Sequence, residues 1–514
     1  MVHTTGPGPS IRNDGDGEAR FRPARGPQSD DAVVETRLES DSLGEMAVPH
    51  DAYWGIHTAR ALENFPITRR AISNYPDLIR GLARVKHAAA LANKELGVLS
   101  ATKADVIVTV CEEMWEGQWH EQFVLGAVQG GAGTSTNMCA NEIIANRGLE
   151  IMGFGKGEYE HLHPIDDVNR SQSTNDVYPT AIKLGMVFGV QRLFAEHRLL
   201  ADSFHRKGVE FQEILKVGRT QLQDAVPMTL GQEFKGFATT LREDHDRIKE
   251  TIPFLCEINL GATAIGTGIT ADPRYAEVVR GHLAALTGLA IKTAPDLIEA
   301  TSDAGVFMTL SSTLKRAAVK MSKICNDLRL LSSGPQAGFG EINLPARQAG
   351  SSIMPGKVNP VIPEAVNQVA FAIMGADTTV TAAAEAGQLQ LNAFEPIIAS
   401  SILQSVVWLT NSCRTLRVNC VDGITANVEH LNYQVETSVG VVTALTPYIG
   451  YHKAAVIAKE ALATGATIRA LVISQGLMDE AELDRVLSPE RLSGLDVGTG
   501  AILLPTDSEP ERPG

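Results

Sequence analysis

The chain has 514 residues, of which 44% are hydrophobic and 20% charged, a composition typical of a folded protein with a large core. Its formal net charge of −15 argues against a nucleic-acid partner, because phosphate contacts require a basic surface. No apolar run is long enough to cross a bilayer, so a membrane partner is not expected either.

The chain is predicted to begin with a disordered tail, residues 1–37, followed by a helical N-terminal domain, residues 38–174. The tail is rich in Gly, Pro, Arg and Asp and lacks the apolar stretch of a secretory signal. In the domain, apolar residues recur at spacings of three and four between Pro76 and Gly97, the pattern of one buried helix face. Ser100 is expected to cap the next helix and Gly117 to end it.

Long helices are predicted to dominate residues 175–427. The clearest runs from near Ser302 to Leu331 and stops at the Ser-Ser-Gly-Pro sequence that follows, so it makes a rod of ~45 Å. Similar patterns cover 177–213, 227–252, 363–393 and 396–418. Rods of this length need partners, which predicts an all-α fold with a central long-helix bundle. A small helical domain with a disordered end, residues 428–514, is expected to follow.

A loop near residues 350–359 carries the densest chemistry in the chain. It belongs to the stretch AGSSIMPGKVNPVIPEAVNQ, residues 349–368, in which glycines and prolines surround two serines, a lysine and an asparagine. Such a loop could close over a small anion, with a hydroxyl as a base and a lysine as the positive charge. The alternative is an ordinary Gly/Pro loop with solvated polar residues.

Two hydroxyl-rich segments precede predicted helices, GTSTN at 133–137 and SQSTND at 171–176. Residues of these types are ordinary helix N-caps. The same geometry also binds anions, because the unpaired N–H groups of the first turn and the helix dipole point outward. Either reading holds for one segment alone, and the two together with the lysine loop favour an anion site.

Six blocks in order, including DAYWGIHTARALENF, NRSQSTNDVYPT, GRTQLQDAVPMTLGQEF, NLGATAIGTG and GSSIMPGKVNP, resemble the fumarase/aspartase superfamily over roughly residues 38–504. The resemblance implies three mostly helical domains and a homotetramer whose bundles combine into one helical core. Each active site would then collect segments from three subunits. The continuation VIPEAVNQV is closer to the aspartase branch than to the fumarase branch.

The resemblance also implies roles for individual residues. Ser351 is expected to be the catalytic base, and Lys357 to act with it. The expected substrate-binding residues are Thr134, Ser173, Thr174, Asn175, Thr220, Gln221, Ser352 and Asn359. Glu364, at the start of the following helix, is left out of the catalytic set because the histidine with which its fumarase counterpart pairs is absent.

The residue type at position 221 distinguishes elimination of ammonia from elimination of water. In the fumarases that the chain resembles, histidine is typical at this position. Hydroxide needs an acid to leave, whereas an α-ammonium leaves as neutral ammonia, and glutamine can hydrogen-bond but cannot donate a proton at neutral pH. The resemblance therefore implies a carbon–nitrogen lyase that converts L-aspartate to fumarate and ammonia. A polar residue lining a helix start is the structural alternative for Gln221.

Two other functions stay open, a class II fumarate hydratase and a catalytically silent scaffold on the same fold. The expected partners are small molecules and copies of the chain itself. No cofactor is expected to be required, activation by a divalent metal such as Mg²⁺ is left open, and His161-Leu162-His163 is more typical of a surface or capping role than of a metal site. Six cysteines without a CxxC pair predict reduced thiols in a cytoplasmic protein.

Overall fold

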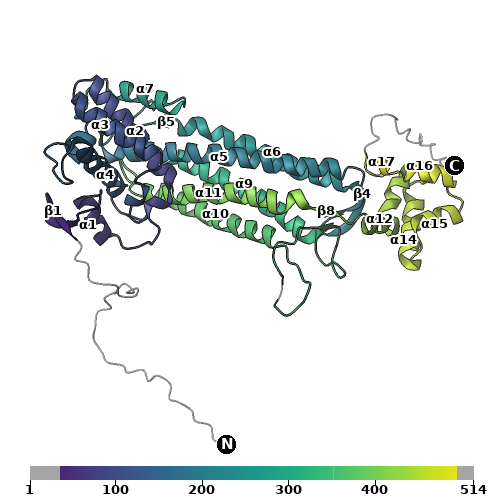
Figure 1. Cartoon of the computed structure of the whole chain (residues 1–514). Helices are drawn as coiled ribbons and strands as arrows, with labels where there is room; N and C mark the ends of the chain where they lie inside the picture. Colours follow the sequence, from purple (N-terminus) through teal and green to yellow (C-terminus); the bar gives the residue numbers. More distant parts are fainter. Residues whose placement is uncertain (1–34, 351, 495–514) are drawn as a thin grey trace, which may run out of the picture.

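The computed structural model describes residues 35–350 and 352–494, in which a long helical bundle lies between two end domains (Figure 1). The all-α prediction is confirmed, since strands occur in this part of the chain as four two-stranded pairs beside many helices. Most of the predicted tail lies outside the described residues, as does the end after residue 494. The first strand, β1, already begins at Thr36, inside the segment predicted as tail.

The N-terminal domain contains the helices that the spacing of apolar residues predicts. Helix α2 begins at Pro76, where a residue without an N–H suits the first turn, and ends at Glu95. The Ser100 side chain accepts a hydrogen bond from the Lys103 N–H and caps α3, which ends at Trp115 before Gly117. The elements are β1 (Thr36–Asp41), β2 (Gly44–Pro49), α1 (Ile56–Asn64), η1 (Ile72–Asn74), α2 (Pro76–Glu95), α3 (Ala101–Trp115), η2 (His120–Gln122), α4 (Thr134–Met152) and η3 (Pro164–Val168).

Five long helices form the bundle, and their buried residues join the N-terminal domain in one continuous core. In α9 the buried positions follow the predicted stripe, with Leu310, Leu314, Met321 and Leu328 almost fully covered. The longest rod, α5, has 37 residues and is ~55 Å long. The rods are α5 (Thr174–Glu210), α6 (Leu230–Leu255), α9 (Gly305–Leu331), α10 (Val361–Glu385) and α11 (Glu395–Asn419).

Two predicted helix boundaries are wrong for identifiable reasons. Helix α10 ends at Glu385 rather than near residue 393, because the Asn392 amide donates to the carbonyls of Ala383 and Ala384 and so caps the helix end. Helix α6 begins at Leu230 rather than near residue 227, because the residues between the end of α5 and Leu230 include an antiparallel hairpin. That hairpin consists of β3 (Leu215–Thr220) and β4 (Gln223–Thr229).

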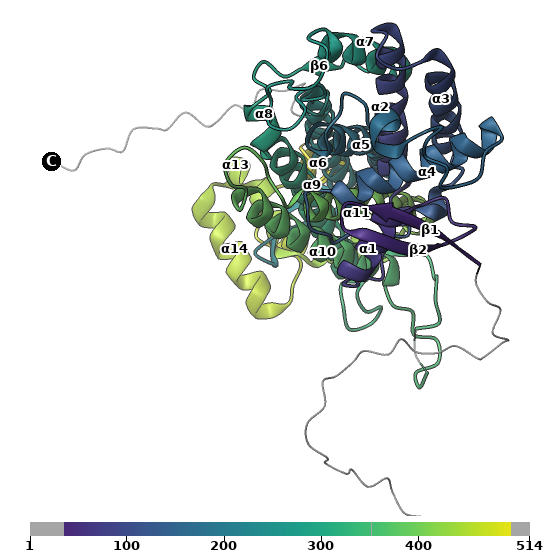
Figure 2. The same cartoon turned by 90° about the vertical axis from the view of Figure 1, so that its left-hand side faces the viewer.

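An excursion between α6 and α9 returns to the N-terminal domain. Its helix α7 packs against α2, and Figure 2, which looks along the bundle, shows the two helices next to each other. Helix α7 therefore packs against the N-terminal domain, although the division predicted at residue 174 assigns its residues to the central bundle. The excursion contains β5 (Glu257–Ile258), α7 (Tyr275–Thr287), β6 (Lys292–Thr293) and α8 (Glu299–Ser302).

The C-terminal domain has a small core of its own, built around Leu445, Ile457, Val472 and Leu483. At the end of the bundle next to this domain, β7 (Ile342–Asn343) pairs with β8 (Thr425–Ala426), which comes after η4 (Val421–Gly423) in the chain. No helix in the described residues is long and apolar enough to cross a membrane. The domain's elements are α12 (Val428–Thr437), η5 (Val439–Leu445), α13 (Thr446–Ile449), α14 (Tyr451–Thr464), α15 (Ile468–Ser474), α16 (Glu480–Val486) and α17 (Pro489–Leu492).

Candidate active site

At the start of α4, the Gln129 side chain accepts the Thr136 N–H over 3.0 Å and the Gly131 carbonyl accepts the Thr134 N–H, so within the described residues the Ser135 N–H has no partner. The N-cap of α4 is Gly133, with φ of 89°, and a Cβ at this position would lie 2.3 Å from the Tyr178 ring. The exposed Thr134 follows it, and the Thr134 hydroxyl donates to the Gly131 carbonyl over 2.7 Å. This helix start presents the Ser135 N–H and the positive end of the dipole to an anion.

The start of α5 lies beside the start of α4. Ser173 caps α5 by accepting a hydrogen bond from the Asn175 N–H, and the Asp176 side chain accepts one from the Ser173 N–H. The Thr174 hydroxyl accepts a hydrogen bond of 3.2 Å from the Asn137 amide of α4. The structure therefore brings four of the predicted residues together, Thr134, Ser173, Thr174 and Asn175, at two adjacent helix starts.

A buried polar layer supports these helix starts. The Lys86 ammonium of α2, which has no exposed surface, donates to the side-chain oxygens of Asn169 and Gln172, both over 2.9 Å. Asn137 and Asn141 donate to the same Asn169 oxygen. Burial lowers the pKa of Lys86 to about 7. Sequence reasoning missed Lys86, although its place within the apolar stripe of residues 76–97 was a signal.

Thr220 and Gln221 lie at the far end of the bundle, at the tip of the β3–β4 hairpin. Gln221 and Leu222 both have positive φ, 55° and 61°, which is the conformation of a two-residue hairpin turn. The structural alternative for Gln221, a polar residue lining a helix start, is therefore wrong. Both predicted residues are exposed, and α5 separates them from Ser173.

A buried ionic cluster holds the hairpin to the segment that leads into the serine loop. The Lys216 ammonium lies 2.8 Å from a carboxylate oxygen of the fully buried Glu341 and 2.7 Å from one of Glu233. Arg219 donates to the other Glu341 oxygen, and its guanidinium carbon lies 4.3 Å from the centre of the Phe339 ring. The hairpin is thus fixed at its base while its tip stays exposed.

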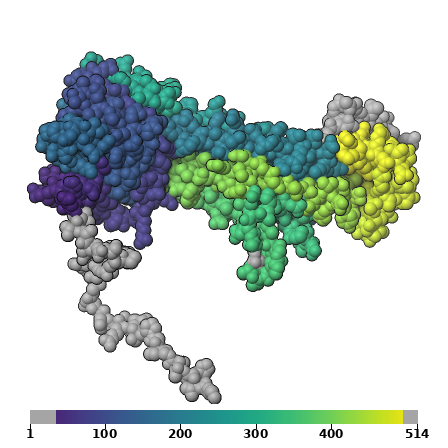
Figure 3. Space-filling model, viewed as in Figure 1, coloured from purple at the N-terminus to yellow at the C-terminus, as the bar shows by residue number. Residues whose placement is uncertain are grey.

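The predicted lid loop projects from the bundle, as Figure 3 shows. Its neck is closed by two hydrogen bonds of 2.8 Å, from the Gly350 N–H to the Lys357 carbonyl and from the Asn359 amide to the Gly350 carbonyl. A Cβ at residue 350 would lie 2.1 Å from the Lys357 oxygen, so the neck requires glycine. Ser352 and Lys357 are exposed, and Ser351 lies outside the described residues.

The predicted site residues thus form three groups that one chain does not bring together: the helix starts, the hairpin tip and the loop. The roles assigned to them stay predictions. Glu364 lies in the first turn of α10, where its charge favours the helix dipole. His163 caps η3 by accepting hydrogen bonds from the N–H groups of Ile165 and Asp166. The described residues contain no group of three His, Cys, Asp or Glu side chains that could hold a metal ion.

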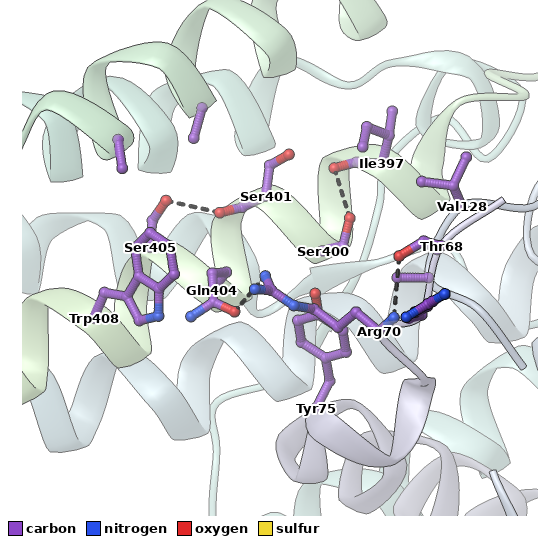
Figure 4. A pocket seen from close by; sticks show the side chains of 14 residues that line it. Thr68, Arg70, Tyr75, Val128, Ile397, Ser400, Ser401, Gln404, Ser405 and Trp408 are labelled. Carbon is purple, nitrogen blue, oxygen red and sulfur yellow. Dashed lines mark hydrogen bonds between the residues drawn. The ribbon is translucent and has the colours of Figure 1, made fainter. Parts of the chain in front are cut away.

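A surface cavity of about 460 Å³ lies between the N-terminal domain and helices α10 and α11 (Figure 4). The Arg70 guanidinium donates to the Gln404 side chain over 2.7 Å and lies 5.9 Å from the Trp408 ring centre. None of the predicted site residues that the structure describes lines this cavity. A second depression continues from it along α10 and α11, with Ala372 and Trp408 common to both.

Comparison with known proteins gives one consistent result. The family model described as "Lyase" matches residues 44–375, and that described as "Fumarase C C-terminus" matches residues 441–494. The chain is 58% identical to an aspartate ammonia-lyase of Pseudomonas aeruginosa over 461 residues, which is 90% of this chain and 97% of that protein. It is 53% identical to the aspartate ammonia-lyase of Escherichia coli K12 over 457 residues, 89% of this chain and 96% of that one.

Solved structures agree with this result. The structure of fumarate lyase:delta crystallin from Brucella melitensis bound to cobalt is 53% identical, with a TM-score of 0.87 over 89% of this chain and 100% of that one. The class II fumarase of Schistosoma mansoni is 34% identical, with a TM-score of 0.85 over 90% of this chain and 100% of that one.

Proposed function

We infer the activity of this chain from one premise: it belongs to the fumarase/aspartase superfamily of lyases. It is an aspartate ammonia-lyase, a carbon–nitrogen lyase that reversibly eliminates ammonia from L-aspartate to give fumarate. The observation that carries this conclusion is 53–58% identity to aspartate ammonia-lyases over about nine-tenths of the chain, against 34% to the fumarase. Gln221 agrees with it, because an amide suits an ammonium that needs no acid to leave.

The proposed reaction begins with transfer of the C3 proton to the Ser351 alkoxide, which the positive charge of Lys357 stabilises. The electron pair of the C3–H bond moves onto the adjacent carboxylate to give an enediolate. It then returns to form the C2–C3 double bond of fumarate as the C2–N bond breaks and neutral ammonia leaves. Hydrogen-bond donors that already face the developing charge lower the barrier, and one such donor contributes about 3 kcal/mol. The Ser135 N–H at the start of α4 and the hydroxyl groups at the start of α5 supply donors of this kind.

The remaining roles follow from which groups can pair with which charge. Lys357 and Asn359 hold the carboxylate remote from the abstracted proton. Asn175 and Gln221 lie near the ammonium, and Thr220 contacts the substrate. The carboxylate that becomes the enediolate is held by Thr134, Ser173, Thr174 and Ser352. All the groups named are side chains of the protein, and we propose that no cofactor is required. Activation by Mg²⁺ is a separate question, tested by comparing rates in EDTA and in Mg²⁺.

We further propose that the chain works as a homotetramer with active sites shared among three subunits. Two facts support this: the three groups of site residues lie apart in one chain, and the groove along α10 and α11 is open. The small residues Ala365, Ala372 and Ala376 line this groove together with Trp408, so a helix of another copy could approach closely. The six cysteines, all buried and outside disulfides, support the cytoplasm as its compartment.

A substrate comparison tests the activity. The purified protein is incubated with L-aspartate or with L-malate, and fumarate is followed by its ultraviolet absorbance. Rapid formation of fumarate from aspartate alone is the expected result. Fumarate from malate alone would identify a hydratase, the activity named for the Schistosoma protein of the same fold. Absence of turnover on both would point to the silent scaffold.

A further inference from the structure

The start of α5 is fastened to the turn at residues 259–264 by four hydrogen bonds. The Asp176 carboxylate accepts two, from the N–H groups of Gly261 and Thr263, both 3.0 Å long. The Asn259 amide donates to the Asn175 backbone carbonyl over 3.0 Å, and the Asn175 amide donates to the Ala264 carbonyl over 2.8 Å. This turn forms the first part of the NLGATAIGTG block, residues 259–268, to which the proposed reaction assigns no role.

The Ala264 carbonyl determines which way the Asn175 amide faces. A carbonyl oxygen only accepts, so the NH₂ end of the amide must point toward it and the Oδ1 end away from it. Asn175 Oδ1 accepts no hydrogen bond from any residue that the structure describes, and the side chain is half-buried at the helix start. A fixed amide oxygen is an acceptor for an ammonium, which only donates. An amide turned the other way would set donor against donor.

Asn259 controls this arrangement without reaching the helix surface itself. It is fully buried, and its NH₂ group is shared between the Asn175 carbonyl and the Thr301 hydroxyl, at 3.0 and 3.1 Å. It thereby fixes residue 175 relative to the turn that carries the Ala264 carbonyl. Gly261, with φ of 98°, lets this turn pass against Ala276, where a Cβ at residue 261 would lie 2.6 Å away.

We propose that Asn259 is a positioning residue for recognition of the substrate's amino group: it holds the Asn175 amide with its oxygen toward the ammonium. The proposal rests on the proposed function and deepens it, since it names the group that distinguishes an amino acid from the same dicarboxylate without nitrogen. Asn259 acts through Asn175 and touches no substrate.

Two constants separate positioning from a general structural effect. The KM for L-aspartate and the inhibition constant of succinate, a dicarboxylate without an amino group, are measured in wild type and in Asn259→Ala. In Asn259→Ala we expect KM for aspartate to rise about tenfold, because one hydrogen bond to a charged group is lost. The inhibition constant of succinate should stay within about twofold of the wild-type value. In an Asn175→Ala background the same substitution should leave both constants unchanged, because the group it positions is gone.

Thr301→Val is the matched control, since it removes the other partner of Asn259 and leaves its bond to residue 175. It should not change the ratio of the two constants. If Asn259→Ala does not fold, Asn259→Ser replaces it and cannot reach the Asn175 carbonyl. Suppose that Asn259→Ala weakens the binding of aspartate and of succinate equally, while the wild type releases fumarate from aspartate. That result would overturn the positioning role alone. A wild type that forms no fumarate from aspartate would overturn the proposed function and this role together.

Discussion

Ser173 and Thr220 stand at opposite ends of one helix: Ser173 caps the start of α5, and Thr220 lies at the tip of the hairpin that follows its end. Helix α5 has 37 residues and spans ~55 Å, which no L-aspartate molecule can bridge. If both residues contact the same substrate, they belong to different subunits.

Mixed assemblies should recover activity. Ser173→Ala and Lys357→Ala each damage every site when alone. In a tetramer formed from equal amounts of the two variants, about a quarter of the sites should draw an intact residue from each kind of subunit. Turnover of aspartate after mixing and refolding should therefore approach a quarter of the wild-type rate. A rate no higher than the mean of the two variants would place both residues in a site within one chain.

Ser351→Ala tests the base. Removal of a general base typically costs 10²–10⁴-fold in rate, so we expect kcat to fall by roughly 10³-fold while KM for aspartate changes little. Steady-state kinetics with fumarate absorbance measures both. Ser352→Ala is the control beside it and should raise KM more than it lowers kcat. A Ser351→Ala enzyme with near wild-type kcat would show that another group takes the proton.

Lys357 supplies the positive charge of the exposed loop. Lys357→Ala should raise KM for aspartate about tenfold or more and lower kcat as well, because a charge-assisted hydrogen bond to a carboxylate is lost. Added salt should weaken substrate binding to wild type more than to the variant. Unchanged affinity of Lys357→Ala for aspartate, measured by calorimetry, would remove the residue from the carboxylate site.

His197 makes stability depend on pH. It is buried between α5 and α6 beside His245, and burial lowers its pKa to about 4. Between pH 4 and 6.5 the unfolded chain therefore binds a proton that the folded chain does not. Stability contributed by the neutral ring is lost as pH falls through this window, ~2 kcal/mol at pH 5 relative to neutral pH.

The variant His197→Phe tests this origin. Its free energy of unfolding should fall less than that of wild type between pH 7.5 and 5.0, when urea denaturation is followed by circular dichroism. Equal losses in both proteins would assign the acid sensitivity to other groups. His205→Phe serves as the matched control, because it changes a histidine on the same helix that is only half-buried.

The helices could be predicted because their buried faces repeat at spacings of three and four, as in α2 and α9. Boundaries failed where a single side chain or turn decides them: the Asn392 amide ends α10, and positive φ at Gln221 and Leu222 makes the hairpin. Neither Gln nor Leu is a usual residue for that conformation, so the sequence offers little signal.

Grouping of the site residues was the part least accessible from the sequence. The sequence could place Thr134 and Ser173 each at the start of a helix. The structure shows that these two helix starts pack together. Lys86 was missed because a lysine in an apolar stripe is usually assumed to extend to the surface, whereas here buried amide oxygens of Asn169 and Gln172 accept its hydrogen bonds. The distance between Ser173 and Thr220 depends on the course of α5, which no local motif encodes.

A crystal structure of the protein with succinate bound tests the central claim most directly. We predict one succinate at a point where the α5 start of one subunit, the Gln221 hairpin of a second and the closed loop of a third meet. The Ser351 hydroxyl should lie within about 3.5 Å of a methylene carbon. Succinate held by residues of a single subunit, or a closed loop with Ser351 remote from both methylenes, would contradict the account.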